Sequence, residues 1–162
     1  MQDQDVQVRS NVADALGNIG SEDAVPALIQ ALQDVQNPDV RSGAAEALGS
    51  IGAKDAVPAL IQALQDQDSW VHMNVAWALG SIGKGAVDAV PALIKLLQDQ
   101  NWDIRNSAAM TLGKIGKDAV PALIQALQDQ NENVRDSAAW ALGQIGEGAV
   151  DAVSALIQLL QD

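Results

Sequence analysis

Residues suited to chemistry are few in this 162-residue chain: one histidine, 21 acidic residues and one glycine-rich stretch. His72 is the only imidazole and cysteine is absent, so thiolate nucleophiles, disulfides and cysteine-based zinc sites are excluded. The acidic residues stand at expected helix caps and on the surface, and no pair stands out as a general acid and base. The stretch GSIGKG at 80–85 lacks the spacing of a phosphate-binding loop. The sequence therefore predicts no enzyme, no catalytic residue, no metal site and no cofactor.

The charge and hydrophobicity of the chain limit the kinds of partner that it can bind. The formal net charge of −12 repels phosphate backbones, so nucleic-acid binding is not expected. The acidity either keeps the chain dissolved or complements a basic partner. Hydrophobic residues make up 48% of the chain, enough for a packed interior, yet no apolar stretch approaches the ~20 residues of a membrane span. With no signal peptide visible, we expect a soluble, cytoplasmic protein without a membrane segment.

The elements that must position these side chains come from one unit that occurs five times. Its clearest mark is the pattern GxIG, which recurs roughly every thirty residues. The first glycines of this pattern are Gly17, Gly49, Gly80, Gly113 and Gly143. Behind each pattern comes Val-Pro-Ala-Leu-Ile, or Val-Ser-Ala-Leu-Ile in the fifth copy. We therefore expect a single domain over residues 1–162, with repeats at about 5–36, 37–67, 68–100, 101–130 and 131–162.

Each unit is expected to hold two helices, as the second copy illustrates. The stretch NPDVRSGAAEALGSIG begins with Asn37, a favoured N-cap, and its apolar residues share one helical face until Gly52 ends the helix. The other copies place Asp5, Asp68, Asn101 and Asn131 at this cap. The stretch DAVPALIQALQD forms the second helix, with Asp55 as its expected cap and Pro58 in its first turn. Such a pair cannot bury its apolar face alone, so the pattern predicts an all-α solenoid of five stacked two-helix repeats.

A family resemblance rests on these motifs. The pattern DxxVRxxAAxALGxIG followed by DAVPALIxAL resembles the HEAT-like repeat of the phycobilisome-lyase type, and it is similar to artificial binding scaffolds built on consensus HEAT-like repeats. The resemblance covers essentially the whole chain. It implies a ladder between repeats, in which an Asp that closes one helix pairs with the Arg of the next. The matching residues are Asp34, Asp66, Asp99 and Asp129, with Arg41, Arg105 and Arg135. His72 takes the Arg position in the third copy, where we expect a surface or ladder role. The substitution either weakens the ladder at this place or makes it depend on pH.

Comparing the copies separates positions that the stack needs from positions that it leaves free. Counted from the cap of the first helix, positions three, seven, eight, ten and eleven barely change. Positions one, two, five, six and nine differ from copy to copy, and we call these the variable positions. They form one stripe opposite the expected buried face. All four Trp and both internal Met fall on variable positions.

The Trp and Met side chains in copies three to five predict a surface that binds a protein partner. Trp is strongly enriched in binding hot spots, and Met adapts its shape to a partner. The predicted residues are Trp70, Met73, Asn74, Trp77, Trp102, Asp103, Asn106, Met110, Glu132, Asp136 and Trp140. The resemblance to artificial scaffolds implies that these positions line a concave groove. The competing interpretation, that the Trp rings fill gaps over neighbouring helices, does not explain why every aromatic residue avoids the invariant positions.

Three functional hypotheses follow. The first is a non-catalytic scaffold, natural or engineered, that binds a protein through this surface. Near-identical second helices favour design, whereas unequal repeat lengths favour a natural origin. The second, implied by the resemblance alone, is a lyase-type chaperone for bilin attachment. The third is a structural protein that self-associates through ends that carry no polar cap.

Overall fold

The computed structural model describes residues 5–161, and within that range it holds α-helices, 3₁₀ helices and turns but no strand. The longer helices are the first helices of the repeats: α1 (Val6–Ile19), α3 (Pro38–Ile51), α5 (Ser69–Ile82), α7 (Trp102–Ile115) and α9 (Glu132–Ile145). The second helices are α2 (Val25–Leu32), α4 (Val57–Ala63), α6 (Val90–Leu96), α8 (Val120–Ala126) and α10 (Val153–Gln161). The 3₁₀ helices that precede them are η1 (Glu22–Ala24), η2 (Lys54–Ala56), η3 (Gly83–Ala89), η4 (Lys117–Ala119) and η5 (Gly146–Ala152).

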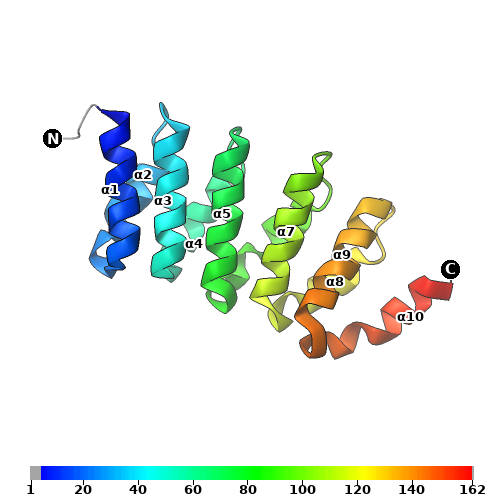
Figure 1. The fold of residues 1–162 in the computed structure, drawn as a ribbon. Helices are drawn as coiled ribbons and strands as arrows, with labels where there is room; N and C mark the ends of the chain where they lie inside the picture. Colours follow the sequence, from blue (N-terminus) through cyan, green and yellow to red (C-terminus); the bar gives the residue numbers. More distant parts are fainter. Residues whose placement is uncertain (1–4, 162) are drawn as a thin grey trace. The chain divides into compact units, whose positions relative to one another are not determined.

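These helices form two compact units that divide between Ile82 and Gly83, inside the third repeat. Unit 1 contains α1 to α5, and its first helices α1, α3 and α5 lie side by side (Figure 1). Unit 2 contains η3 to α10, and in it α7 packs against α9 while α6 packs against α8. Each unit is thus a stack of helix pairs. The single domain over 1–162 stays a prediction, and its residues 1–4 and 162 lie outside the described range.

The first helices begin at the predicted caps. Asn37 and Asp68 each accept hydrogen bonds from two backbone N–H groups of the following turn, at 2.9 to 3.4 Å. The side chains that cap α1, α7 and α9 are Asp5, Asn101 and Asn131. Gly52 ends α3 in the left-handed conformation, with φ 72° and ψ 33°, as expected for a glycine at this place.

The predicted cap of the second helix is wrong. Asp55 lies inside η2, and α4 starts only at Val57, with Ala56 at its N-cap. The 3₁₀ helix runs directly into the α-helix, so the N–H of Val57 donates to the carbonyl oxygen of Lys54. A first turn whose N–H is already bonded in this way has no need of a side-chain cap.

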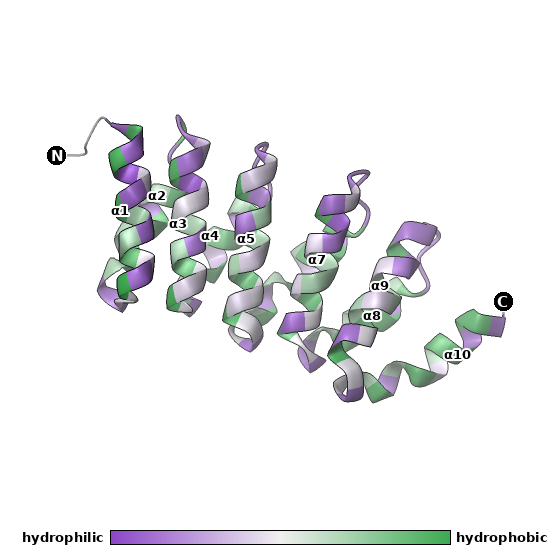
Figure 2. Ribbon diagram, viewed as in Figure 1, coloured by the Kyte–Doolittle hydropathy of each residue, from purple (hydrophilic) through white to green (hydrophobic). Residues whose placement is uncertain are grey.

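Leucines from each of the helices α2 to α9 form much of the core. In unit 1 these are Leu28, Leu48, Leu60 and Leu79, and in unit 2 they are Leu93, Leu112, Leu123 and Leu142, all at most 2% exposed. The turns at the upper ends of α3, α7 and α9 are hydrophilic, whereas the second helices are mainly hydrophobic (Figure 2). None of the helices within residues 5–161 combines the length and apolarity that a membrane crossing requires.

The first glycine of the GxIG pattern sets how closely the first helices of unit 1 approach. A Cβ atom added at Gly17 would lie 2.8 Å from the Cα of Ala47, and one added at Gly49 would lie 2.6 Å from the Cα of Ala78. Real Cβ atoms do not come this close to backbone. These glycines therefore bring the backbones of α1, α3 and α5 into contact, a role distinct from the helix-ending glycine three residues later.

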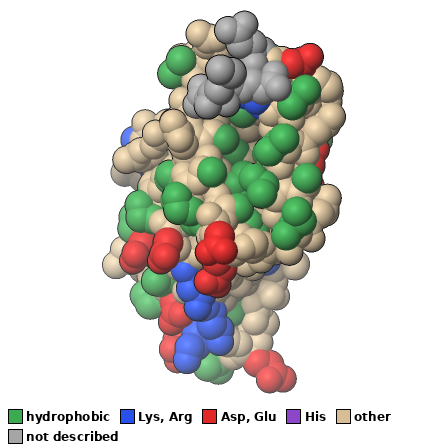
Figure 3. Space-filling view, turned by 90° about the vertical axis from the view of Figure 1, so that its left-hand side faces the viewer, with side chains coloured by type: hydrophobic (Ala, Val, Ile, Leu, Met, Phe, Trp, Pro, Cys, Tyr) green, Lys and Arg blue, Asp and Glu red, His purple; other side chains and the backbone are tan. Residues whose placement is uncertain are grey.

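The outer face of α1 and α2 is apolar. Valines and leucines of these helices line an open groove of about 800 Å³, together with the aliphatic parts of Arg9 and Gln33. Figure 3 looks at this side of the molecule and shows hydrophobic side chains spread over it. Val8 and Val12 of α1 are 42% and 51% exposed here. The corresponding residues of α3, Val40 and Ala44, are 2% and 0% exposed because α1 and α2 cover them.

Candidate protein-binding site

In unit 1, helix α5 carries the predicted binding residues on its exposed side. Trp70, Met73 and Trp77 are 57%, 40% and 41% exposed, and Asn74 is half-buried beside them. These residues lie at spacings of three and four along α5, which puts them on one face of the helix. The sequence therefore placed one aromatic strip of this unit correctly on the surface, while its use in binding stays a prediction.

Trp77 is held in place by the helix beside it. Its Cζ3 atom lies 2.8 Å from where a Cβ of Gly49 would be, so the indole edge rests on the glycine of α3. This contact accounts for part of the burial of Trp77 and agrees in part with the gap-filling interpretation. Trp70, at 57% exposure, is open to a larger extent. A ring fixed along one edge and open on the rest loses little conformational freedom when a partner covers it.

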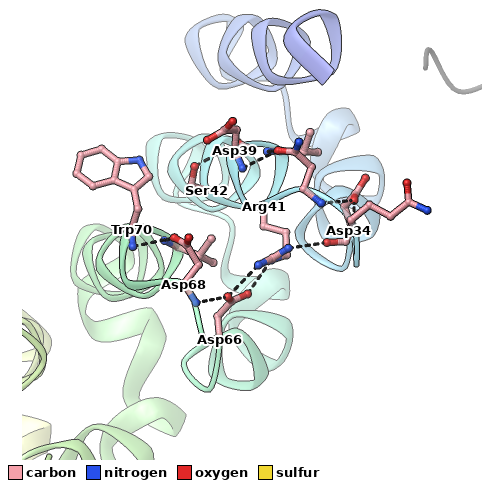
Figure 4. A network of polar contacts seen from close by, with 11 residues as sticks. Asp34, Asp39, Arg41, Ser42, Asp66, Asp68 and Trp70 are labelled. Carbon is pink, nitrogen blue, oxygen red and sulfur yellow. Dashed lines mark hydrogen bonds and ion pairs between the residues drawn. The ribbon is translucent and has the colours of Figure 1, made fainter. Parts of the chain in front are cut away.

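A polar network fixes the start of α5 and with it the position of Trp70 (Figure 4). The N–H of Trp70 donates to Oδ1 of Asp68 at 2.9 Å, and the N–H of Asp68 donates to Oδ1 of Asp66 at 2.9 Å. The carboxylate of Asp66 in turn accepts hydrogen bonds from Nε and Nη2 of Arg41, at 2.7 and 2.9 Å. The bidentate geometry of this pair ties the turn before α5 to the body of α3.

The observed ladder corrects the one that the family resemblance implied. The carboxylates pair with the Arg earlier in their own repeat: Arg9 with Asp34, and Arg41 with Asp66. The bond between repeats goes to a backbone oxygen, because Nη1 of Arg41 donates to the carbonyl oxygen of Asp34 at 2.9 Å. The Asp34 carboxylate is used instead within its own turn, where Oδ1 accepts the N–H groups of the second and third residues after it.

In unit 2, the arginines keep only the backbone part of this arrangement among the described residues. Arg105 donates to the carbonyl oxygens of Asp99 and Gln100 at 2.8 and 3.0 Å. Arg135 donates to the carbonyl oxygens of the two corresponding residues, both at 2.9 Å. An arginine that binds carbonyl oxygens at the end of the preceding second helix satisfies acceptors that the helix leaves unpaired. The ladder is thus a device for closing the turn between repeats.

His72, at the Arg position of the third repeat, is buried at 4% exposure. The surface role considered for it is therefore wrong, since its ring packs inside unit 1. Its charge is close enough to Asp66 to help lower the pKa of that carboxyl. A single buried imidazole beside a paired carboxylate is a structural element of the stack, and no group of three or more possible metal ligands occurs within residues 5–161.

The paired carboxylates titrate below their ordinary range. The hydrogen bond from Arg41 is the largest influence on Asp66 and holds its pKa below the usual 3.8, against the opposing effect of burial. For Asp34 burial is the largest influence and raises the pKa, but the N–H groups of its turn and the side chain of Arg9 together outweigh it. The pKa of Arg41 is raised by its bond to Asp66. Both carboxylates are therefore ionised at neutral pH.

In unit 2, the predicted residues lie on α7 and α9, which pack against each other. Trp102, in the first turn of α7, is 64% exposed, and Met110 on the same helix is 41% exposed. Trp140 on α9 is 40% exposed. The polar residues predicted beside them are exposed at Asp103, Glu132 and Asp136 and half-buried at Asn106.

Two features of this surface were missed in the sequence. The packing role of the first GxIG glycine was not predicted, although its recurrence in every copy was the available signal for a close contact. Exposed carboxylates also stand on the other first helices of unit 1, at Asp14 on α1 and at Asp39 and Glu46 on α3. They occupy variable positions, but copies one and two carry no Trp and were therefore left out of the predicted surface. In α3 the variable positions five and six, Ser42 and Gly43, are in fact buried, and Gly43 faces α1.

Comparisons with known proteins agree with this arrangement of helix pairs. The family model for HEAT repeats matches residues 1–60, 25–113 and 90–162. A chain in the complex of CpcE and CpcF of phycocyanin lyase from Nostoc sp. PCC7120 is 30% identical, with a TM-score of 0.67 over 99% of this chain and 67% of that one. An engineered protein is 25% identical, with a TM-score of 0.64 over 99% of this chain and 82% of that one.

A designed armadillo repeat protein in complex with the peptide (KR)4 shares the fold at 20% identity, with a TM-score of 0.64 over 94% of this chain and 79% of that one. Among curated proteins, none matches the chain significantly.

Proposed function

Because the chain belongs to the HEAT-repeat family, we propose that it is a non-catalytic scaffold that binds a protein partner through the exposed Trp and Met side chains of its first helices. The predicted all-α solenoid is confirmed by the family match and by the helix pairs of both units. Folds of this kind present side chains of successive repeats on an extended surface, and their function lies in that surface.

The exposure of every tryptophan carries this proposal. Trp70, Trp77, Trp102 and Trp140 are between 40% and 64% exposed, whereas the leucines of the core are at most 2% exposed. A Trp side chain has a large apolar area, and leaving it in water forgoes about 25 cal/mol for each Å² that a partner could cover. The stack itself does not need these rings, because α3 holds Glu46 at the position where α5 holds Trp77. Rings that the fold does not require, yet leaves open, are best explained by an external partner.

Selection from a random peptide library on the immobilised protein tests the proposal without assuming a partner. Clones that bind should lose about 2 kcal/mol of binding free energy, roughly thirtyfold in affinity, on Trp77→Ala or Trp102→Ala, whichever lies in the unit that they contact. Val35→Ala is the control, because Val35 is 92% exposed but lies in the turn between α2 and α3. Binding that survives both Trp substitutions would reject the proposal, provided that circular dichroism shows the variants folded.

The similarity to phycocyanin lyase favours a second candidate function, assistance in attaching a bilin chromophore. The Trp and Met faces would then contact the chromophore or the protein that receives it. Titrating free bilin into the protein and recording the visible absorption spectrum separates the two candidates. A shift in the bilin absorption that Trp102→Ala removes would support the second candidate, and an unchanged spectrum would count against it.

We also propose that a second copy of the chain is a partner for the outer faces of α1 and α10. Leu160 of α10 is 88% exposed, whereas the corresponding Leu127, the C-cap residue of α8, is 3% exposed because α9 packs on α8. Val8 of α1 is exposed in the same way relative to Val40 of α3. Joining the two faces would repeat the contact between successive repeats. Sedimentation at increasing concentration tests this: a mass that rises for the wild type and not for Leu160→Glu supports it, and a constant mass contradicts it.

A further inference from the structure

We propose that the face of unit 1 formed by α1, α3 and α5 binds a basic peptide segment that also carries apolar side chains. This inference rests on the proposed function and specifies the chemistry of the partner. The residues concerned are Asp14 on α1, Asp39 and Glu46 on α3, and Trp70, Met73 and Trp77 on α5. We call this set the acidic–aromatic face.

Contacts between neighbouring helices place these residues on one surface. Oδ1 of Asp14 lies 3.4 Å from where a Cβ of Gly43 would be, so this carboxylate leans from α1 onto α3. Trp77 reaches α3 from the other side and rests on Gly49, one turn beyond Glu46 on the same helix face. Asp14 and Trp77 thus both reach α3, the helix that carries Asp39 and Glu46. All members of the face are exposed.

The helices that form this face do not supply cations that neutralise its negative charge. The cationic residues of α1, α3 and α5 are Arg9, Arg41 and His72. Both arginines are ion-paired with the aspartates of the turns between repeats, and the histidine is buried. Within the described residues no ion pair joins Asp14, Asp39 or Glu46 to a cation. Three carboxylates beside an open apolar strip therefore favour a ligand that brings its own positive charge.

Arginine and lysine match both parts of the face. A guanidinium or ammonium group can lie over the exposed indole of Trp77 or Trp70 and pair with a carboxylate of α3 at the same time. The apolar stem of such a side chain covers the ring, and a neighbouring aliphatic residue can contact Met73. An acidic segment or a phosphate backbone would instead be repelled.

The dimensions of the face set the length of the segment. Packed helices lie 8–10 Å apart, so the distance from α1 to α5 across α3 is roughly 16–20 Å. An extended chain spans about 3.3–3.6 Å per residue, so about five or six residues cross the face. We therefore expect a short linear segment with basic residues over α1 and α3 and apolar residues toward α5.

The test is a titration of the protein with a short peptide of alternating Arg and Leu, followed by Trp emission at low and high salt. Two matched peptides, with Glu or Gln in place of Arg, serve as comparisons. The Arg peptide should bind best, and high salt should weaken it. The face variant Asp14→Asn, Asp39→Asn, Glu46→Gln should bind it roughly tenfold more weakly, the size expected for three exposed ion pairs.

The control variant Glu22→Gln, Asp23→Asn, Asp55→Asn removes the same charge from exposed residues of η1 and η2 in unit 1 and should keep wild-type affinity. Equal losses in both variants, or equal binding of the Gln and Arg peptides, would overturn the inference. The library selection described above keeps the two proposals apart. Clones that depend on Trp77 but contain no excess of Lys and Arg would leave the binding function standing and reject the basic partner.

Discussion

Replacing Gly49 by alanine should destabilise unit 1, although alanine is the better helix former. The new Cβ would lie 2.6 Å from the Cα of Ala78, 2.9 Å from its Cβ and 2.8 Å from Cζ3 of Trp77. Non-bonded carbon atoms have their optimal separation at about 3.5–4.0 Å, so α3 and α5 would have to separate by about 1 Å. Overpacking of this kind costs about 1–3 kcal/mol, against a gain of at most about 1 kcal/mol in helix propensity.

Gly143→Ala is the matched control, because within residues 5–161 no atom outside its own stretch of helix lies within 4 Å of the added Cβ. Gly143 also stands at the same place in the GxIG pattern of α9. This substitution should raise stability by up to about 1 kcal/mol. Thermal unfolding followed by circular dichroism compares the two, and about 2–4 °C is expected per kcal/mol for a chain of this size. A Gly49→Ala protein as stable as Gly143→Ala would refute the close-contact account of these glycines.

Other perturbations address the core, the ladder and its pH dependence. Leu79→Ala should lower the free energy of unfolding by about 2–5 kcal/mol in urea titrations, whereas Trp70→Ala should change it by less than about 1 kcal/mol. Asp66→Asn should cost about 2 kcal/mol, because it leaves the buried part of Arg41 with a weaker partner. The pKa values of Asp34 and Asp66 are lowered on folding, so their contribution to stability is present above pH 3.8 and is lost as pH falls through their folded-state values. Melting temperatures measured from neutral to acid pH should fall below that point, and Asp66→Asn should flatten the fall.

Much of the fold could be predicted because each repeat obeys local rules. Asn37 and Gly52 mark the two ends of a helix through the chemistry of capping. Residues of the same kind at the same places in the other copies support the assignment. The prediction that Asp55 caps the second helix was wrong because it used the same capping rule. A 3₁₀ helix takes the place of the cap, and it depends on backbone geometry that no single residue type signals. Local rules thus predict where the helices lie, but they do not predict how the chain passes from one helix into the next.

Contacts between repeats were harder to foresee. A ladder that contains Arg41 could be expected. The hydrogen bond from Arg41 to the carbonyl oxygen of Asp34 could not, because it depends on the path of the turn in three dimensions. The burial of His72 likewise follows from neighbours in other helices. The exposure of the Trp residues was predictable because a variable position in one copy need not serve the stack. The carboxylates of α1 and α3 were overlooked because their relation to Trp77 appears only when the helices lie side by side.

Trp fluorescence with acrylamide quenching, recorded over a wide dilution series, tests the central claim most directly. Rings that are 40–64% exposed should emit at long wavelength and be quenched readily at every concentration, as expected for open surfaces that await a partner. Emission that is blue at high concentration and red on dilution would assign the Trp surfaces to self-association. Blue, protected emission at all dilutions would mean that the tryptophans belong to the core, and the binding-surface account would be wrong.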